Sequence, residues 1–218
     1  MIGTVELHQG KSKLQSIIAA MPGDMSLWNE AETRFQFVDE FIKYCLGWRM
    51  PDIHPEAHEN GDFLDYSLGT PVRVVWEAKR AGVHFDFPAD AHNSLVRSIA
   101  GIFSVSASAK TAMMQVQRYC SAVGSEFAVV CNGSQIIAFI AQRVGQPWAK
   151  GRALVIPNLN ILTNEFSQVW QCLSPDGIAE RRLFRLLDTG TTANIPKNYH
   201  LPFFDSLHFD IKLNFNQI

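Results

Sequence analysis

The chain has 218 residues, of which 47% are hydrophobic and 18% charged, which is enough for one sizeable core. Its net charge of −2 excludes binding to nucleic acid through a global basic field, so such binding requires a local patch or a partner. A signal-peptide pattern and an uncharged apolar run near the ~20 residues of a membrane span are both absent, so we expect a cytoplasmic protein without membrane contact.

The cysteines are scattered through mostly apolar segments and form no CxxC pair. This distribution is typical of buried free thiols in a reducing compartment. The residues are Cys45, Cys120, Cys131 and Cys172.

Apolar spacing predicts two helices near the start of the chain, over about 11–21 and 27–46, with Ser26 as the N-cap of the second. Glu30 and Arg34 continue the inward apolar stripe of the second helix, whereas Glu32 falls on the opposite side. Glu30 is therefore either a first-turn acid paired with Arg34 at i,i+4 or a side chain aimed at a site in the fold.

Residues 48–59 form a loop or an edge strand in this prediction. His54 and His58 are four residues apart, but Pro55 between them argues against a helical pair of zinc ligands and favours a solvated loop.

A hairpin is predicted over 63–68 and 72–79, around the turn Gly69-Thr70-Pro71. Asp65 lies on the first strand, and the two-residue period places Glu77 and Lys79 on one face of the second. Two carboxylates and an ammonium at one sheet edge are costly unless they are paired or used. The alternatives are a surface ion-pair cluster and a functional site.

The rest of the chain alternates between helical and strand patterns. Residues 81–110 suggest a loop, a stretch at 95–103 that could be helical, and a small polar connector at 104–109 that looks mobile. Many large apolar side chains follow residue 195, which suggests a segment that docks on a partner or on a further domain. The remaining predicted elements are helix 110–123, strands 127–131, 136–140 and 153–156, and helices 162–173 and 175–188.

Taken in order, these motifs resemble the PD-(D/E)XK nuclease superfamily. More narrowly, they are similar to the N-terminal nuclease domain of type I restriction enzyme motor subunits and of related prokaryotic defence proteins. The resemblance covers residues 28–140 well and 165–195 loosely; it departs from the pattern at Leu64 (often Pro), at Cys131 (Thr) and in the long stretch 82–110. It is carried by Asn-Glu-Ala-Glu-Thr-Arg at 29–34 with Leu-Gly-Trp at 46–48, Gly-Asp-Phe-Leu-Asp-Tyr at 61–66, Val-Trp-Glu-Ala-Lys-Arg at 75–80, Gln-Val-Gln-Arg-Tyr at 115–119 and Val-Val-Cys-Asn-Gly at 129–133.

The resemblance implies an α/β fold with a restriction-endonuclease-like core. Its central mixed sheet would have four to five strands flanked by helices, with extra C-terminal helices. The nuclease-like domain would span residues 1–195, with its core at about 27–140, and residues 196–218 would be a tail or linker. The implied activity is Mg²⁺-dependent hydrolysis of phosphodiester bonds in DNA, with Mn²⁺ as a substitute, in restriction or phage defence.

The resemblance also implies roles at the metal site. Asp65, Glu77 and the backbone carbonyl of Ala78 would bind the metal ion, and Glu30 would hold a second ion or its waters. Lys79 would position or activate the attacking water, or balance the phosphate charge.

Further residues would contact the nucleic acid. Gln115 would reach the site or the DNA backbone, with Tyr119 bracing it. Arg34, Arg80 and Arg118 would contact phosphates, or would serve as ion-pair partners.

Two other interpretations remain open at this stage. One is a non-catalytic relative that only binds DNA or a partner. The other is a module of a larger assembly, joined to a motor or sensor subunit, to a further domain or to copies of itself. The absence of a GxxxxGK[ST] motif agrees with a motor supplied from outside this sequence.

Overall fold

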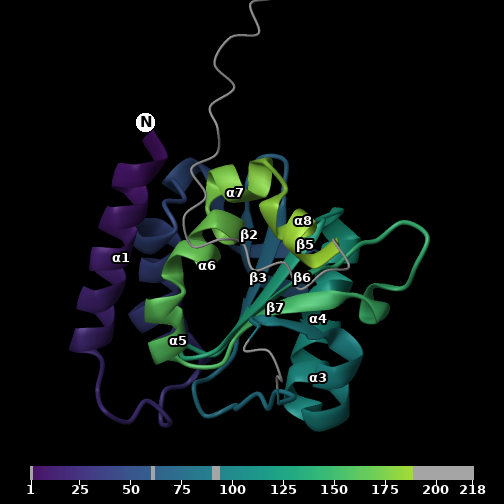
Figure 1. Cartoon of the computed structure of the whole chain (residues 1–218), viewed down its shortest axis with the longest axis horizontal. Coiled ribbons are helices and arrows are strands. Elements are labelled where there is room, and N and C mark those ends of the chain that lie inside the picture. The colour runs from purple at the N-terminus through teal and green to yellow at the C-terminus, as the bar shows by residue number, and fades with distance from the viewer. Residues whose placement is uncertain (1, 60–61, 90–93, 189–218) are drawn as a thin grey trace, which may run out of the picture.

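The computed structural model describes residues 2–59, 62–89 and 94–188. Its centre is a seven-stranded mixed sheet in the order β1-β2-β3-β5-β6-β7-β4 (Figure 1). The strands are β1 (Ile53–Glu59), β2 (Asp62–Leu68), β3 (Val74–Ala78), β4 (Val96–Ser98), β5 (Phe127–Cys131), β6 (Ile136–Ile140) and β7 (Arg152–Ile156).

The fold is α/β, as predicted. The predicted number of four to five strands is wrong, because β1 and β4 extend the sheet at its two edges. Neither edge strand has the apolar alternation of a half-buried strand: β1 reads Ile-His-Pro-Glu-Ala-His-Glu, and β4 has only three residues. Pro55 is compatible with an edge position, where one row of backbone N–H groups needs no partner. Of the two alternatives predicted for residues 48–59, a loop or an edge strand, the structure confirms the edge strand.

The strand directions follow the connections between them. β1, β2 and β3 are antiparallel neighbours, whereas β3 and β5 are parallel, from Val74↔Phe127 to Ala78↔Cys131. The parallel crossover runs through α3 (Ile99–Val105) and α4 (Ala107–Val123), as parallel pairing requires a long connection. The wholly apolar β5 is buried in the middle of the sheet, as its composition predicts.

Helices cover both faces of the sheet (Figure 1). On one face α3 and α4 pack over a core that includes Val75, Val116 and Phe139. On the other face the core includes Trp76 and Phe166. That second layer is built from α1 (Ile2–Ala20), the helix over residues 30–45, α5 (Leu159–Asn164), α6 (Phe166–Leu173), α7 (Pro175–Ala179) and α8 (Arg182–Asp188).

The predicted helix 27–46 begins later and is less regular than expected. α2 (Glu30–Thr33) starts after the N-cap Asn29, not Ser26, and is followed by π-helical turns η1 (Arg34–Val38) and η2 (Phe41–Cys45). Leu27 precedes the N-cap and is 88% exposed, so the prediction that it faces inward is wrong. The inward stripe predicted further along is confirmed, because Val38, Phe41, Ile42, Cys45 and Leu46 are all buried.

The segment after β3 is part of the fold and not a loose insertion. The predicted mobile connector 104–109 is wrong, because Ser106 is buried and caps α4 by accepting a hydrogen bond from the Ala109 N–H. The stretch expected to be helical at 95–103 divides into β4 and α3. Phe85 is fully buried in the core under α3 and α4. Sequence patterns did not indicate these elements, because β4 is short and the segment is polar and rich in serine.

The C-terminal part matches the expected extra helices, although each predicted helix is divided in two: 162–173 corresponds to α5 and α6, and 175–188 to α7 and α8. All four cysteines are buried and free, as predicted. In the described part of the chain, no helix has the length and apolar character needed to cross a bilayer. The predicted domain end at 195 and the tail 196–218 lie outside the described residues.

Candidate metal centre at the end of β3

The β2–β3 ladder opens at Asp65. Backbone pairing between the two strands runs from Leu68↔Val74 to Tyr66↔Trp76 and stops there. Beyond it, the Oδ2 atom of Asp65 accepts a hydrogen bond from the Ala78 N–H at 2.7 Å. The aspartate side chain therefore replaces a strand partner, and this bond fixes its carboxylate beside the end of β3.

Glu77 and Lys79 meet on the same face of β3, as the two-residue period predicts. The Lys79 Nζ donates to the Glu77 Oε1 at 2.6 Å, and the Lys79 N–H donates to the Cys131 carbonyl on β5 at 2.7 Å. Glu77 is only 3% exposed. Its second oxygen, Oε2, is buried without a hydrogen-bond partner among the described residues. A buried carboxylate oxygen left without a donor is costly, so this atom marks a position where a positive ligand would be stabilised.

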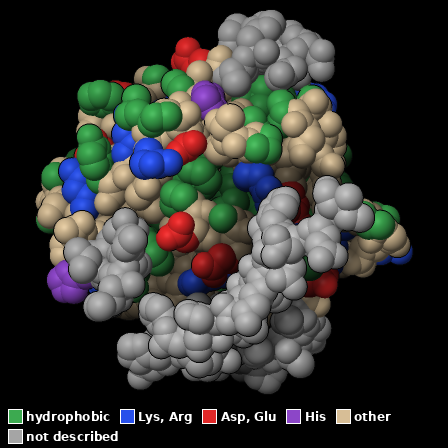
Figure 2. All heavy atoms as spheres, turned by 90° about the horizontal axis from the view of Figure 1, so that it is seen from above, with side chains coloured by type: hydrophobic (Ala, Val, Ile, Leu, Met, Phe, Trp, Pro, Cys, Tyr) green, Lys and Arg blue, Asp and Glu red, His purple; other side chains and the backbone are tan. Residues whose placement is uncertain are grey.

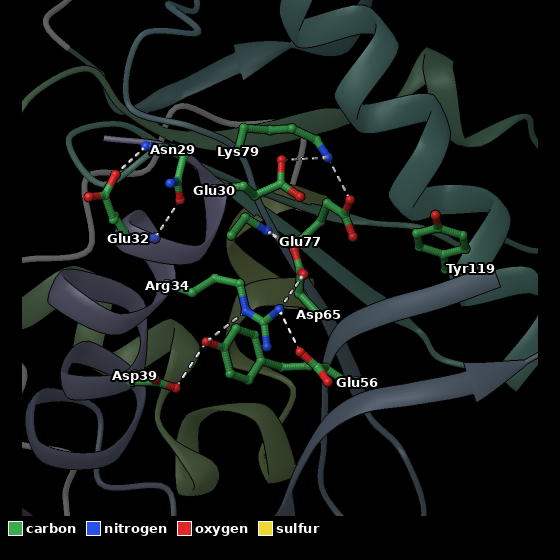
Figure 3. A network of polar contacts seen from close by, with 12 residues as sticks. Asn29, Glu30, Glu32, Arg34, Asp39, Glu56, Asp65, Glu77, Lys79 and Tyr119 are labelled. Carbon is green, nitrogen blue, oxygen red and sulfur yellow. Dashed lines mark hydrogen bonds and ion pairs between the residues drawn. The ribbon is translucent and has the colours of Figure 1, made fainter. Parts of the chain in front are cut away.

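Glu30 reaches the same place from the start of α2 (Figure 3). A capping box holds this helix end: the Glu32 N–H donates to the Asn29 Oδ1, and the Asn29 N–H donates to the Glu32 carboxylate. Glu32 is thus occupied at the cap, whereas the Glu30 Oε2 lies 3.9 Å from the Lys79 Nζ. The Asn-x-x-Glu pattern at residues 29–32 is the signal that could have located this cap in the sequence.

One carboxylate oxygen from each of Glu30, Asp65 and Glu77 lies within 4.8 Å of the other two. No other group of three potential metal-ligating side chains occurs in residues 2–59, 62–89 and 94–188 with such spacing. Hard divalent cations prefer oxygen ligands, and Mg²⁺ is usually held by one or two carboxylates with waters completing the shell. The donor set and the unpartnered Glu77 oxygen therefore fit such an ion. The role predicted for the Ala78 carbonyl remains a prediction.

Burial and mutual repulsion shape the electrostatics of the three acids. Burial raises the pKa of Glu77 to about 7, against the attraction of Lys79 and with the help of the Asp65 charge. Burial likewise raises the pKa of Asp65 and of Glu30. Burial disfavours the charge of Lys79, but attraction by Glu77 and the other two acids outweighs it and raises the pKa of Lys79. Lys79 is consequently a protonated ammonium at neutral pH.

Arg34 joins this site through acids other than the one predicted. Its Nη1 lies 3.3 Å from the Asp65 Oδ1 and 3.2 Å from the Glu56 Oε1, so the i,i+4 partner Glu30 is not the acid it binds. Its Nε donates to the Tyr66 hydroxyl at 3.4 Å. Sequence reasoning did not single out Glu56 or Tyr66; their pairing depends on how β1 and β2 lie against η1.

The other predicted residues are Gln115, Tyr119, Arg118 and Arg80. The Gln115 Nε2 donates to the Tyr119 hydroxyl at 2.9 Å, which confirms their shared helix face, but no hydrogen bond joins either residue to the described carboxylates. Arg118 is exposed and stacks over the Tyr119 ring. Arg80 is exposed and forms no ion pair with a described residue. Their predicted contacts with nucleic acid remain predictions.

The outer surface carries mixed charges. Figure 2 views the molecule from above and shows basic, acidic and apolar side chains interspersed on that face. A field of one sign is not visible there, in agreement with the net charge of −2. Any recognition of phosphate on this face would have to depend on a few individually placed cations.

Comparisons with known proteins do not assign the chain to a family. No protein-family model, no curated protein and no solved structure matches it.

Proposed function

We propose that this protein is a metal-dependent endonuclease of the PD-(D/E)XK type that hydrolyses phosphodiester bonds of DNA, in restriction or phage defence. The observation that carries this proposal is the convergence of Glu30, Asp65 and Glu77 on one point beside Lys79, with one buried Glu77 oxygen left unpartnered. The resemblance of the sequence motifs supplies the reaction class.

The central strands also support the proposal. Asp65 lies on β2 and Glu77 on β3, which form an antiparallel pair, and α4 leads from there to the parallel strand β5. This is the arrangement expected of a restriction-endonuclease-like core, with the acid-bearing hairpin at the site and the Gln115 helix as the crossover.

Asp65, Glu77 and Glu30 would hold the divalent ion. When bound there, the ion would offset the charge of the scissile phosphate and lower the pKa of a water molecule. Asp65 is fixed by the Ala78 N–H and Glu77 by Lys79, so two of the three carboxylates are oriented before any ligand arrives.

Lys79 would act as a charged donor. Its ammonium uses one hydrogen on Glu77, and its side chain remains 16% exposed, so the other hydrogens can bind a water or a phosphate oxygen. Because its pKa is raised, Lys79 is suited to stabilising negative charge and to orienting the attacking water, and not to removing a proton at neutral pH.

A plasmid-nicking assay tests the proposal. The purified protein should nick supercoiled DNA with Mg²⁺ or Mn²⁺ and not with EDTA, and Lys79→Ala should lower the rate by roughly 10²-fold or more while DNA binding persists. Lys13→Ala is a matched control, since Lys13 is also bonded to a glutamate, Glu40, at 2.8 Å. Undiminished cleavage by Lys79→Ala and Asp65→Ala would refute the site assignment, and metal-independent binding without cleavage would favour a non-catalytic module.

A further inference from the structure

Arg34 holds a central position between the acids of the proposed metal site and a second set of polar groups (Figure 3). The Nη1 of Arg34 contacts both Asp65 and Glu56, and its guanidinium carbon lies 5.1 Å from the centre of the Tyr66 ring. The Tyr66 hydroxyl accepts from the Arg34 Nε and donates to the Asp39 Oδ1 at 2.9 Å. Asp39 thereby orients the hydroxyl so that its lone pair faces Arg34.

The position of Arg34 bears directly on Asp65. With Oδ2 bonded to the Ala78 N–H and Oδ1 facing Arg34, both oxygens of this carboxylate already have partners. An incoming divalent cation has to share an oxygen of Asp65 with one of these partners or replace the partner, and on either oxygen it meets the positive charge of Arg34 at short range. Like charges in a partly buried site repel strongly, because the screening by water is weaker there.

Glu56 offers Arg34 an alternative partner. It lies in β1 with a left-handed φ of 52°, an uncommon conformation for a residue other than glycine, and its carboxylate faces Arg34 across the sheet edge. If Arg34 leaves Asp65, the pair with Glu56 and the bond to Tyr66 can persist. The guanidinium would then expose donors suited to a phosphate oxygen.

We propose that Arg34 is the resident counter-cation of Asp65, that Tyr66 and Asp39 position it, and that metal and substrate phosphate bind by exchange: the metal takes Asp65 from Arg34, and Arg34 takes the phosphate. This inference rests on the proposed nuclease function and adds to it a coupling between the two ligands. The exchange explains why the Arg34 guanidinium lies within 3.3 Å of Asp65, one of the three proposed metal ligands.

A structural role for Arg34 makes the opposite prediction. If Arg34 only braced Asp65, its removal would misplace a metal ligand and weaken metal binding. If Arg34 competes with the metal, its removal strengthens metal binding although a contact has been lost. The direction of the change separates the two roles.

Mn²⁺ binding without nucleic acid tests the competition. Free Mn²⁺ can be measured by its paramagnetic resonance signal at pH 7.5, with thermal unfolding as a check that each variant folds. Arg34→Met should bind Mn²⁺ roughly tenfold more tightly than wild type, whereas Arg34→Lys, which keeps the charge, should stay within about threefold of wild type. Tyr66→Phe, which frees Arg34 but keeps the ring, should fall between.

Each outcome of this titration has a distinct meaning. The exchange is refuted if Arg34→Met binds Mn²⁺ no more tightly than wild type, or if Arg34→Lys gains as much affinity for Mn²⁺ as Arg34→Met does. In both cases, Mn²⁺ binding by the wild-type protein would still support the metal site. If Arg34→Met binds Mn²⁺ and the wild-type protein does not, the competition between Arg34 and the metal is supported most strongly. If neither the wild-type protein nor Arg34→Met binds Mn²⁺, the metal site of the proposed function is refuted, and so is the exchange.

The coupling to phosphate is tested in a background that does not cut. In Lys79→Ala protein a short DNA duplex should tighten Mn²⁺ binding several-fold, because the DNA gives Arg34 another partner. Adding Arg34→Met should remove most of this gain. A gain that is undiminished in the double variant would contradict the proposed transfer of Arg34 to phosphate.

Discussion

Two clusters of polar side chains lie at the same end of the sheet, one after β3 and one after β5, and they are built differently. The cluster after β5 consists of Asn132 and Gln135, which are 1% and 2% exposed. Its amide groups are bonded to one another and to backbone groups of Val83, Phe85 and Pro157. The cluster at β3 contains Glu77, equally buried, with an oxygen that has no partner among the described residues.

The difference indicates what each cluster does. A neutral network whose donors and acceptors are satisfied stabilises the fold, and this one ties the segment after Lys79 to the β5–β6 turn. A charged cluster with an unsatisfied atom costs stability unless a ligand completes it. We therefore expect substitutions in the first cluster to affect folding, and substitutions in the second to affect ligand binding and activity.

The largest expected effect is on activity at Glu77. Glu77→Gln keeps the shape but removes the ligand charge, so nicking should fall by roughly 10²–10⁴-fold and Mn²⁺ binding should be lost. The variant should nevertheless unfold at the same temperature as wild type or higher at pH 8 without metal. Calorimetry alongside the nicking assay checks both halves; a Glu77→Gln protein that is much less stable would place Glu77 with the structural cluster.

The second expected effect is on folding at Gln135. Gln135→Ala removes the acceptor for the Phe85 N–H and the donor for the Phe85 carbonyl. Leaving such buried groups unpaired should lower the free energy of unfolding by about 2–4 kcal/mol, measured by urea denaturation. Mn²⁺ affinity of the folded protein should remain within a few-fold of wild type. A large loss of affinity without a loss of stability would remove the distinction between the clusters.

The third effect is a pH dependence of stability that belongs to the acidic cluster. Because the pKa of Glu77 rises from 4.5 in the unfolded chain to about 7 in the fold, its contribution is fully present below pH 4.5 and is lost as the pH rises through 7. The loss is on the order of 3 kcal/mol. Lys79 stays protonated throughout this window and does not reverse the sign.

Thermal unfolding from pH 5 to pH 8 measures this dependence. Relative to Glu77→Gln, the wild-type protein should lose stability as the pH rises, and Mg²⁺ or Mn²⁺ should reduce the loss by favouring the ionised acids. Parallel curves for the two proteins would show that Glu77 is not the group responsible.

The smallest expected effect lies at Tyr119, whose hydroxyl is bonded to Gln115 and not to the acidic cluster. Tyr119→Phe removes the acceptor of the Gln115 Nε2 and should lower stability by about 1 kcal/mol or less. If Gln115 contacts the DNA backbone, its looser position should reduce nicking by a few-fold, with Mn²⁺ affinity unchanged. A change in Mn²⁺ affinity would assign Tyr119 to the metal site itself.

The parts predictable from sequence are those set by local periodicity. β5 and β6 were predicted with their observed limits, because wholly apolar runs between turn residues leave little choice. The contact between Glu77 and Lys79 follows from the pleat of a single strand. These features depend on few long-range contacts.

The parts that escaped prediction depend on tertiary structure. The helix begins at Glu30 because Asn29 and Glu32 form its capping box, and this late start leaves Leu27 outside the helix and exposed. The Arg34 contacts require β1, which has a polar sequence, to pair with β2 and present Glu56. The unpartnered oxygen of Glu77 is visible only once its surroundings have been placed.

The most direct test of the central claim is a crystal structure of the protein soaked with Mn²⁺, with the metal located by anomalous scattering. A peak is expected within bonding distance, roughly 2.0–2.3 Å, of oxygens from Asp65 and Glu77, with Glu30 contributing directly or through water. The formerly unpartnered Oε2 of Glu77 should be among the ligands. A fully ionised, well-ordered site that stays empty at saturating Mn²⁺, or a peak elsewhere in the molecule, would contradict the proposed metal site.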